Sequence, residues 1–284
     1  MRFRLKSFPI VAAIVMLASC STATNSYSAL DQPNSGWSLV FRDEFNGHGK
    51  PDPEKWISQE YNRKKNPDGP DGWWLKDNVS LTGWGQLEIS ATQIPNRNPE
   101  EDDDPYDYAS GMVSTEGKFE TTFGRYEARI KLPQDPGWWL AFWLFADEVH
   151  RVDGSGEDGT EIDIVEAFGW TDKISYALHW DGYGKRHKTK NKREFHPGIR
   201  SGWHVFALEW TETEYTWFVD GEQVWQSAAG GVSKVPLWVK LSGEISTQST
   251  VAHKWWSNVP DNKRLPDRFP VSYTHLRAHE TKAN

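Results

Sequence analysis

The stretch Glu161-Ile162-Asp163-Ile164-Val165-Glu166 decides how this chain folds around its chemistry. Three carboxylates alternate with β-branched apolar residues, the pattern of a strand whose successive side chains point to opposite faces. Glu161 and Asp163 then share a face, whereas Glu166 would point to the other. One extra residue, a β-bulge near Ile164-Val165, would return Glu166 to the first face. The sequence therefore predicts a bulged strand that presents three carboxylates together.

Three acids on one face of a strand suit the cleavage of a glycosidic bond. Retaining hydrolysis needs a carboxylate nucleophile and a carboxylic acid about 5–5.5 Å apart. A third charge nearby helps to separate their pKa values. We expect Glu161 to be the nucleophile and Glu166 the acid/base, with Asp163 hydrogen-bonded to Glu161 to orient it. The alternative is a solvated strand face whose acids have no catalytic role.

The order of motifs resembles the bulged branch of glycoside hydrolase family 16, which includes laminarinases, agarases, porphyranases and kappa-carrageenases. Besides the acid strand, the resemblance rests on the stretches Val40–Gly47, Ser110–Met112, Gly124–Pro133, Trp139–Leu144, Trp203–Trp210 and Phe218–Gly221. Short strand-like segments, with Asp220-Gly221 as a hairpin turn, already predict an all-β sandwich. The resemblance implies more specifically a β-jelly roll of two antiparallel sheets with a concave substrate cleft, and an enzyme without a cofactor.

The N-terminal residues differ from the rest of the chain. Residues 1–19 are typical of a signal peptide, with a basic start and an apolar run too short to span a bilayer. Leu17-Ala18-Ser19-Cys20 resembles a bacterial lipoprotein box, which implies cleavage before Cys20 and lipidation of its thiol. By the same resemblance, Ser21 favours an outer-membrane or cell-surface lipoprotein. The alternative is an ordinary signal peptide and a secreted or periplasmic protein. Residues 20–36 would form a flexible tether.

Residues 37–271 are expected to form one catalytic domain. After Phe269-Pro270-Val271 the family pattern breaks, because residues 272–284 are polar and basic where apolar and aromatic residues should continue. We expect this tail to be foreign to the fold and to contribute little to it. The acidic run Glu100–Asp104 favours a solvated loop; a calcium site there is the alternative, without a recognised ligand spacing.

The charge and cysteine content limit the kinds of molecule that this protein is expected to bind. The formal net charge is −8, and loss of three basic residues with the signal peptide makes it −11. An acidic surface argues against a nucleic-acid binder. Cys20 is the single cysteine, so the exported domain has no internal disulfide. We expect a monomer that binds a polysaccharide and contacts the membrane only through a lipid on Cys20.

Seventeen tryptophans are more than a core of this size needs. An indole stacks on the apolar face of a sugar ring while its N–H finds a polar partner. Two or three of six candidates are expected to be sugar platforms: Trp73, Trp74, Trp139, Trp143, Trp170 and Trp180. The resemblance also implies that His179 faces the cleft near the acid/base, a packed core histidine being the alternative. The histidines show no ligand spacing, so no catalytic metal is expected.

Six bases lie within nine residues in the run Lys185–Arg193. A solvated loop is one interpretation, and recognition of sulfate esters is the other. The leading function is an endo-acting, retaining hydrolase of β-1,3- or mixed-linked glucan. The alternatives are an endo-hydrolase of an algal galactan of the agar, porphyran or carrageenan type, and a non-catalytic carbohydrate-binding protein. Transglycosylation would use the same residues.

Overall fold

The computed structural model describes residues 37–63, 72–100, 106–135, 137–169, 171–245 and 271–281, the last range by its backbone. The expected signal peptide, Cys20 and the tether lie outside the described residues, as do Trp170 and most of the acidic run. Among the residues described, no helix is long and apolar enough to cross a membrane.

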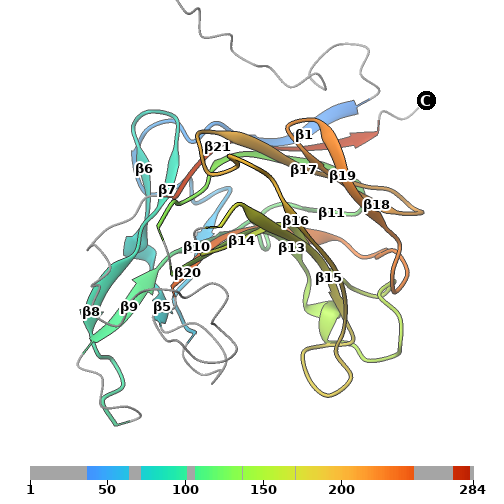
Figure 1. The fold of residues 1–284 in the computed structure, drawn as a ribbon, viewed down its shortest axis with the longest axis horizontal. Helices are drawn as coiled ribbons and strands as arrows, with labels where there is room; N and C mark the ends of the chain where they lie inside the picture. The colour runs from blue at the N-terminus through green and yellow to red at the C-terminus, as the bar shows by residue number, and fades with distance from the viewer. Residues whose placement is uncertain are drawn as a thin grey trace, which may run out of the picture.

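Two large sheets stack on each other as curved layers (Figure 1), and within the described residues one has nine strands and the other eight. The nine-stranded sheet runs in the spatial order β19 (Glu222–Ser227), β18 (Tyr215–Val219), β17 (His204–Trp210), β12 (Gly124–Lys131), β21 (Val271–Thr281), β7 (Leu87–Ile89), β6 (Val79–Thr82) and β2 (His48–Gly49), with β1 (Trp37–Asp43) also paired to β21.

The eight-stranded sheet holds the acid strand near its middle. Its order is β16 (Lys188–Phe195), β15 (Lys173–Trp180), β14 (Glu161–Phe168), β13 (Trp138–Phe145), β20 (Leu237–Ile245), β10 (Met112–Ser114) and β3 (Ile57–Ser58), with β11 (Glu120–Thr121) also paired to β20. The pairings in both sheets are antiparallel, as the sequence predicted.

A third, smaller sheet adjoins the large ones and was not predicted. Its order is β4 (Tyr61–Asn62), β5 (Gly72–Trp74), β9 (Tyr106–Ser110) and β8 (Thr92–Pro95), with β5 and β9 parallel. Two 3₁₀ turns complete the described elements, η2 (Lys76–Asn78) and η3 (Asp147–His150). Strands β9 and β5 of the small sheet contact β20 of the eight-stranded sheet (Figure 1).

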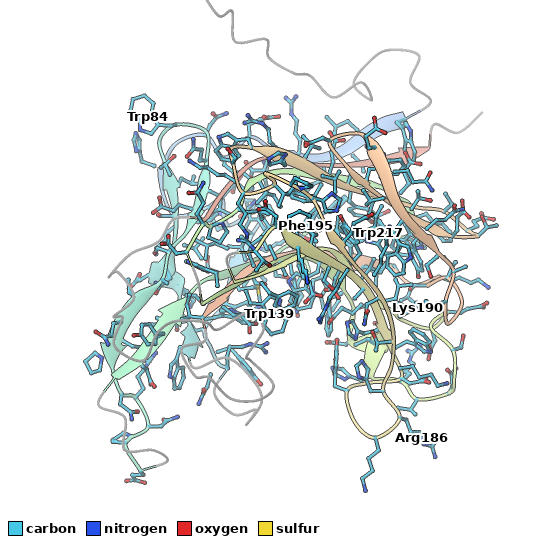
Figure 2. The ribbon with its side chains drawn as sticks, in the orientation of Figure 1. Trp84, Trp139, Arg186, Lys190, Phe195 and Trp217 are labelled. Atoms are coloured by element: carbon cyan, nitrogen blue, oxygen red, sulfur yellow. The ribbon has the colours of Figure 1, made fainter. Side chains whose placement is uncertain are left out.

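The hydrophobic core lies between the two large sheets. Strand β13 alternates so that Trp138, Leu140 and Phe142 are fully buried, while β18 supplies Trp217 from the opposite layer. Figure 2 shows Trp217 between the sheets. Because successive residues of a strand face opposite ways, the same alternation that fills the core leaves the other face of the eight-stranded sheet for function.

The predicted hairpin at Asp220-Gly221 is confirmed. Both residues have positive φ, 50° and 86°, and β18 pairs with β19 directly around them through Val219 and Glu222. Two left-handed residues in a two-residue loop match the right-handed twist of the flanking strands. The side-chain oxygens of Asp220 also bind back to β17, accepting the backbone N–H of Val205 at 2.8 Å.

The C-terminal segment differs from the sequence expectation. We expected residues 272–284 to contribute little to the fold, but residues 271–281 form β21, which pairs with β12, β7 and β1. Its register shifts against both β12 and β1, between Glu127 and Arg129 and between Leu39 and Phe41. Strand pairing uses main-chain groups, so a segment without the expected apolar alternation still occupies the place between β12 and β7.

Candidate active site

The acid strand is bulged where the sequence predicted. Against β15, Asp163 pairs with Ala177 and Glu166 with Ser175, so three steps on β14 span two on its neighbour. Ile162, Ile164 and Val165 are all buried in the core cluster, and the three acids are not part of it. The bulge thus brings Glu161, Asp163 and Glu166 to one face of the sheet, which is turned away from the core and is called the acid face.

Glu161 begins β14 and is held by a residue that the sequence analysis did not single out. The hydroxyl of Tyr183, in the loop after β15, donates a hydrogen bond to Oε2 of Glu161. Burial and the charge of Asp163 raise the pKa of Glu161 to about 7, against the opposing effects of His179, Tyr183 and Lys240. These three groups favour the ionised form, which a nucleophile needs.

Glu166 is buried beside a tryptophan. The indole Nε1–H of Trp139 donates to Oε1 of Glu166 at 3.0 Å. Burial, together with the charges of Asp163 and Glu161, raises the pKa of Glu166 well above its usual range, while His179 and Trp139 oppose this. A carboxyl that keeps its proton near neutral pH is what a general acid requires.

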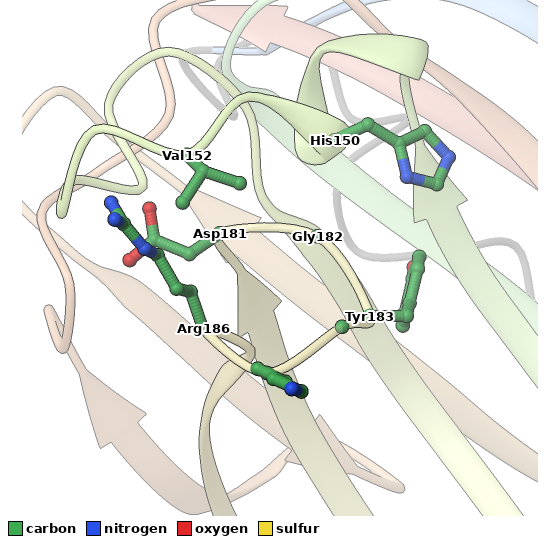
Figure 3. A pocket seen from close by; sticks show the side chains of 8 residues that line it. His150, Val152, Asp181, Gly182, Tyr183 and Arg186 are labelled. Atoms are coloured by element: carbon green, nitrogen blue, oxygen red, sulfur yellow. The ribbon is translucent and has the colours of Figure 1, made fainter.

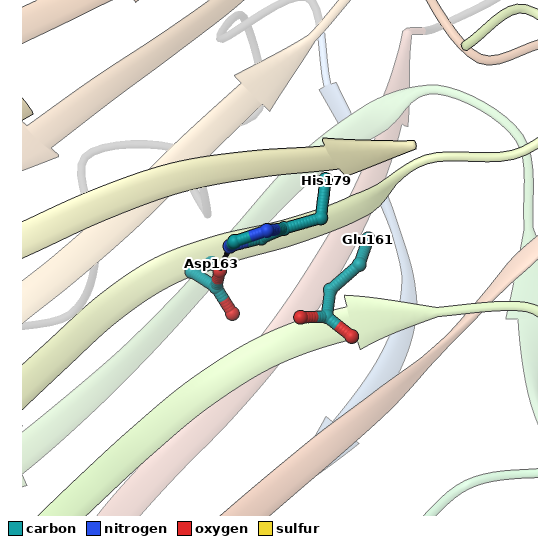
Figure 4. A group of neighbouring side chains, drawn as sticks. All are labelled: Glu161, Asp163 and His179. Atoms are coloured by element: carbon teal, nitrogen blue, oxygen red, sulfur yellow. Dashed lines mark ion pairs between the residues drawn. The ribbon is translucent and has the colours of Figure 1, made fainter. Parts of the chain in front are cut away.

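Asp163 lies between Glu161 and Glu166 along β14. Its carboxylate faces His179 (Figure 4). Nε2 of His179 is 3.3 Å from Oδ2 of Asp163. Burial lowers the pKa of His179, but the hydrogen bond and charge of Asp163 and the charges of both glutamates outweigh it and raise this pKa to about 9. We expected Asp163 to hydrogen-bond Glu161; the carboxylate is instead directed at a histidine, since two ionised carboxylates have no proton to share.

Among the described residues, Glu161, Asp163 and His179 form a group that could hold a metal ion, because their donor atoms lie within 4.8 Å of one another. In this structure each of the three already has a protein partner. That the site works without a catalytic metal stays a prediction. A His179 that is protonated on both nitrogens has no lone pair to offer a cation.

The family model for glycosyl hydrolases family 16 matches residues 70–251, more than half of the chain. The chain belongs to glycosyl hydrolase family 16. A β-glucanase of Rhodothermus marinus is 34% identical over 195 residues, which are 65% of this chain and 63% of that protein. A glucan endo-1,3-β-glucosidase A1 of Niallia circulans is 27% identical over 70% of this chain and 32% of its own length. The match thus spans less than two thirds of either relative.

Solved structures of the same family share the fold over nearly their whole length. The catalytic domain of a laminarinase from Thermotoga petrophila superposes with a TM-score of 0.66 and 26% identity, covering 87% of this chain and 99% of that one. The endo-β-1,3-glucanase of Pyrococcus furiosus gives a TM-score of 0.68 at 25% identity, over 87% and 96% of the two chains. The jelly-roll architecture inferred from the sequence is confirmed.

Strand β13, which pairs with the acid strand, presents two tryptophans beside the acids. Trp139 contacts Glu166, and the Nε1–H of Trp143 donates to Oγ of Ser242 on β20 at 3.1 Å. The ammonium group of Lys240 lies 4.5 Å from the centre of the Trp143 ring. Burial lowers the pKa of Lys240 to about 8 despite the charge of Glu161. Both indoles lie on the acid face, and sugar stacking on them stays a prediction.

Two other tryptophan candidates, Trp180 and Trp74, are buried. Trp180 belongs to the core cluster, and a Cβ added to Gly230 would lie 2.6 Å from its ring. His179 faces the acids, so the next residue along the strand must face the core. Trp74 is 5% exposed and donates its Nε1–H to the carbonyl of Gly243 at 3.0 Å, so neither is available as an open sugar platform.

Trp73 lies on the other side of β5 and lines a cavity of about 530 Å³ with Tyr61 and Arg97. Its Nε1–H donates to Oδ2 of Asp107 at 3.0 Å. The guanidinium of Arg97 lies 4.6 Å from the ring centre. Trp73 therefore keeps its candidacy as a binding residue away from the acids, and this stays a prediction.

From Lys188 onward the basic run forms a strand, where we had expected a loop. Residues 188–195 form β16, an exposed edge strand of the eight-stranded sheet. Two of its bases have acidic partners, Lys188 with Asp181 and Lys192 with Glu194, each at 2.9 Å. Alternating exposed charges on an edge strand also discourage pairing with another chain. Lys185 and Arg186 precede the strand, and Figure 2 shows Arg186 at the tip of the connecting loop.

That loop borders a second cavity, of about 490 Å³, whose lining includes His150, Asp181, Tyr183 and Arg186 (Figure 3). Tyr183 connects this cavity to the nucleophile, because its hydroxyl binds Glu161 while its ring packs 5.5 Å from that of His150. No periodic pattern places a loop side chain, so sequence reasoning missed Tyr183. The only available signal was its position, three residues beyond Trp180.

A fourth acid on this face was also missed. Glu244, on β20, is paired in register with Trp139 and is buried. Arg63 holds it through an ion pair of 2.7 Å, from Nη2 to Oε1. Burial raises the pKa of Glu244, and the charge of Arg63 opposes the shift. Glu244 stands in the run Ser242-Gly243-Glu244, which matches no catalytic spacing. Its partner Arg63 follows β4 of the small sheet and is far from Glu244 in sequence.

Proposed function

We propose that this chain is an endo-acting, retaining β-glycanase whose substrate is a β-1,3- or mixed-linked glucan. The observation that carries the proposal is the bulge in β14, which brings Glu161 and Glu166 to one face. Family membership and relatives described as β-glucanase and endo-1,3-β-glucosidase support it. Two acids in different surroundings, one beside hydroxyl and cationic groups and one buried under an indole, suit the two roles of retaining hydrolysis.

In the proposed reaction, the carboxylate of Glu161 attacks the anomeric carbon. Glu166 gives its proton to the oxygen of the leaving sugar, so that the glycosidic bond breaks and a glycosyl ester forms on Glu161. Glu166, now ionised, takes a proton from water as that water attacks the ester. The sugar leaves with retained configuration, and both acids return to their starting state. Between the two glutamates, the negative charge of Asp163 is offset by the positive charge of His179 through both steps.

The primary test is the release of reducing ends from laminarin, mixed-linked glucan, agarose, porphyran and carrageenan. We expect cleavage of laminarin or mixed-linked glucan, and its loss in Glu161→Gln. Glu222→Gln, an exposed acid on β19 in the other sheet, is the matched control and should retain activity. A folded protein that binds these polymers in affinity gels but cleaves none of them would instead be a binding protein.

The second candidate substrate is an algal galactan. A kappa-carrageenase of Pseudoalteromonas carrageenovora is 26% identical over 77% of this chain and 58% of that protein. Lys185 and Arg186 border the cavity beside Tyr183 and would suit a sulfate ester there. The double variant Lys185→Ser, Arg186→Ser tests this. Loss of cleavage of carrageenan or porphyran, with laminarin cleavage unchanged, would favour the galactan.

We also propose export and lipid anchoring through Cys20, at the outer membrane or cell surface, on the signal-like residues 1–19 and the lipoprotein-like box. Two-phase detergent partition of the expressed chain tests this. Wild type should enter the detergent phase, and Cys20→Ala should not. If both stayed in the aqueous phase, the chain would be secreted or periplasmic without an anchor.

A further inference from the structure

His179 is held at both of its ring nitrogens. Nε2 faces Asp163, and Nδ1 lies 2.9 Å from Nε2 of His187. The two imidazole rings are nearly parallel, with an angle of 9° between their planes and 5.0 Å between their centres. His187 belongs to the loop between β15 and β16 and does not touch the acids itself. A relay of three side chains thus runs from the acid face to this loop.

The proton positions follow from the two contacts. Facing a carboxylate, Nε2 of His179 carries a proton, and a doubly protonated His179 also carries one on Nδ1. Nε2 of His187 must then accept that second proton's hydrogen bond, so His187 is neutral with its own proton on Nδ1. Burial and the positive charge of His179 both lower the pKa of His187, which favours this neutral form.

We propose that His187 is a positioning residue, whose neutral imidazole accepts a hydrogen bond from His179 and so holds His179 as a cation against Asp163. This rests on the proposed function, because the consequence is felt at Glu161 and Glu166. The positive charge of His179 lowers the pKa of both glutamates. Without the acceptor, His179 loses its second proton more readily and that effect weakens.

One turn of the loop delivers two contacts to the site. Tyr183 binds Glu161 and His187 binds His179, and their rings lie 5.5 Å apart. The backbone N–H of His187 donates to the carbonyl of Gly184 at 3.0 Å, which closes the turn. The titratable groups around the histidine pair are Glu161, Asp163 and Glu166 on β14, Tyr183 on the loop, His150 on η3 against Tyr183, and Lys240 on β20 toward Glu161.

The sign of the pH effect follows from the nucleophile. Glu161 must be ionised to attack, so a higher pKa of Glu161 moves the acidic limb of the rate profile to higher pH. In wild type, protonation of His187 itself at low pH also removes the acceptor and places two N–H groups against each other. His187→Ala loses the acceptor at every pH, whereas the side-chain carbonyl of His187→Gln can still accept and does not titrate.

The experiment compares both variants as full chains. We expect His187→Ala to lower the pKa of His179 by about one unit, as loss of one hydrogen bond to a charged group implies, and to move the acidic limb of kcat/KM to higher pH. His187→Gln should restore most of the wild-type profile. His48→Ala, which removes an exposed histidine on β2 in the other sheet, is the matched control and should not shift it. Equal profiles for His187→Ala and wild type would overturn the proposal, as would a His187→Gln shift as large as that of alanine.

A second measurement does not depend on activity. NMR titration of the His179 imidazole should give a pKa well above its ordinary value in wild type and His187→Gln, and a lower one in His187→Ala. A His179 that titrates at its ordinary value in wild type would overturn the proposal, even if His187→Ala failed to fold. Failure to cleave any of the five polymers would sink the proposed function instead, and the titration would still decide the role of His187.

Discussion

The indole Nε1–H of Trp217 donates a hydrogen bond of 2.9 Å to the backbone carbonyl of Asp163. Trp217 belongs to β18, in the sheet opposite the acids, and is fully buried. Asp163 is the residue at which the bulge of β14 begins, where the ladder to β15 is interrupted. A bulge leaves main-chain groups without their ladder partners, and here a side chain from across the core supplies one.

Replacing Trp217 with Phe should therefore weaken both the fold and the site. The buried carbonyl of Asp163 loses its donor, which lowers the free energy of unfolding by about 1–3 kcal/mol. Activity should fall further than the folded fraction does, because the bulge orients Glu166. Urea unfolding and kcat on the same samples measure the two effects. Trp225→Phe is the control, since Trp225 stacks on Trp217 at 4.2 Å without touching the bulge. Equal kcat values for the two variants would contradict this role.

Tyr183→Phe should impair the nucleophile and leave the loop in place. The ring keeps its contacts with His150 and His187, and the donor to Glu161 is lost. That donor lowers the pKa of Glu161, so its removal raises this pKa and moves the acidic limb of kcat/KM to higher pH. The expected loss near the acidic limb is about tenfold, from one hydrogen bond to a charged group.

A matched control for that variant is Tyr176→Phe. Tyr176 is on the core-facing side of β15, and its hydroxyl contacts Nε2 of His196 at 2.9 Å, away from the acids. It also loses a hydroxyl with a defined partner, so a general effect on the sheet would appear in both variants. A pH profile displaced equally in both would show that Tyr183 does not act through Glu161.

Chelation should leave catalysis intact. Glu161, Asp163 and His179 are spaced as metal ligands would be, but a His179 with a pKa of about 9 is a cation at neutral pH and repels metal ions. Protein dialysed against EDTA is expected to keep its kcat, with less than one equivalent of metal by elemental analysis. Activity that disappears with EDTA and returns with a divalent ion would overturn this expectation.

The acid strand shows how far sequence reasoning reaches. Side chains alternate between the two faces of a strand, and the proposed chemistry requires all three acids on the same face. These two conditions were enough to place the bulge at Ile164-Val165. The same alternation would have excluded Trp180, because its neighbour His179 was already assigned to the acid face. The tryptophan candidates were chosen on the high tryptophan content, without asking which face of its strand each one occupies. Asp220-Gly221 was predictable because two residues with positive φ are needed in that turn.

Other features had no local signature. The contacts of Tyr183 and His187 arise from the path of one loop. The contact of Arg63 with Glu244 arises because a segment far away in sequence packs beside β20. The side-chain pattern also misjudged residues 272–281, whose place in the sheet depends on main-chain pairing. The sequence thus predicted the acids of β14 and His179 on β15. It missed Glu244 on β20 and the loop residues that tune the charge of the acids.

The final prediction concerns stability against pH. The pKa of Glu161 is raised to about 7 in the folded protein, against about 4.3 in an unfolded chain. Ionisation of Glu161 therefore opposes folding: the penalty is absent below the unfolded pKa and grows until pH exceeds the folded one. Glu161→Gln cannot ionise. It should match wild type at pH 4 and exceed its free energy of unfolding at pH 8 by on the order of 1–3 kcal/mol.

Urea unfolding at both pH values measures this, with Glu222→Gln as the exposed control that should change neither. The variant that abolishes catalysis would then be the more stable protein at alkaline pH, because the nucleophile is kept in surroundings that penalise its charge. A Glu161→Gln protein with equal gains at pH 4 and pH 8 would point to repacking instead of charge. No gain at pH 8 would mean that Tyr183, His179 and Lys240 together compensate the burial of Glu161 fully.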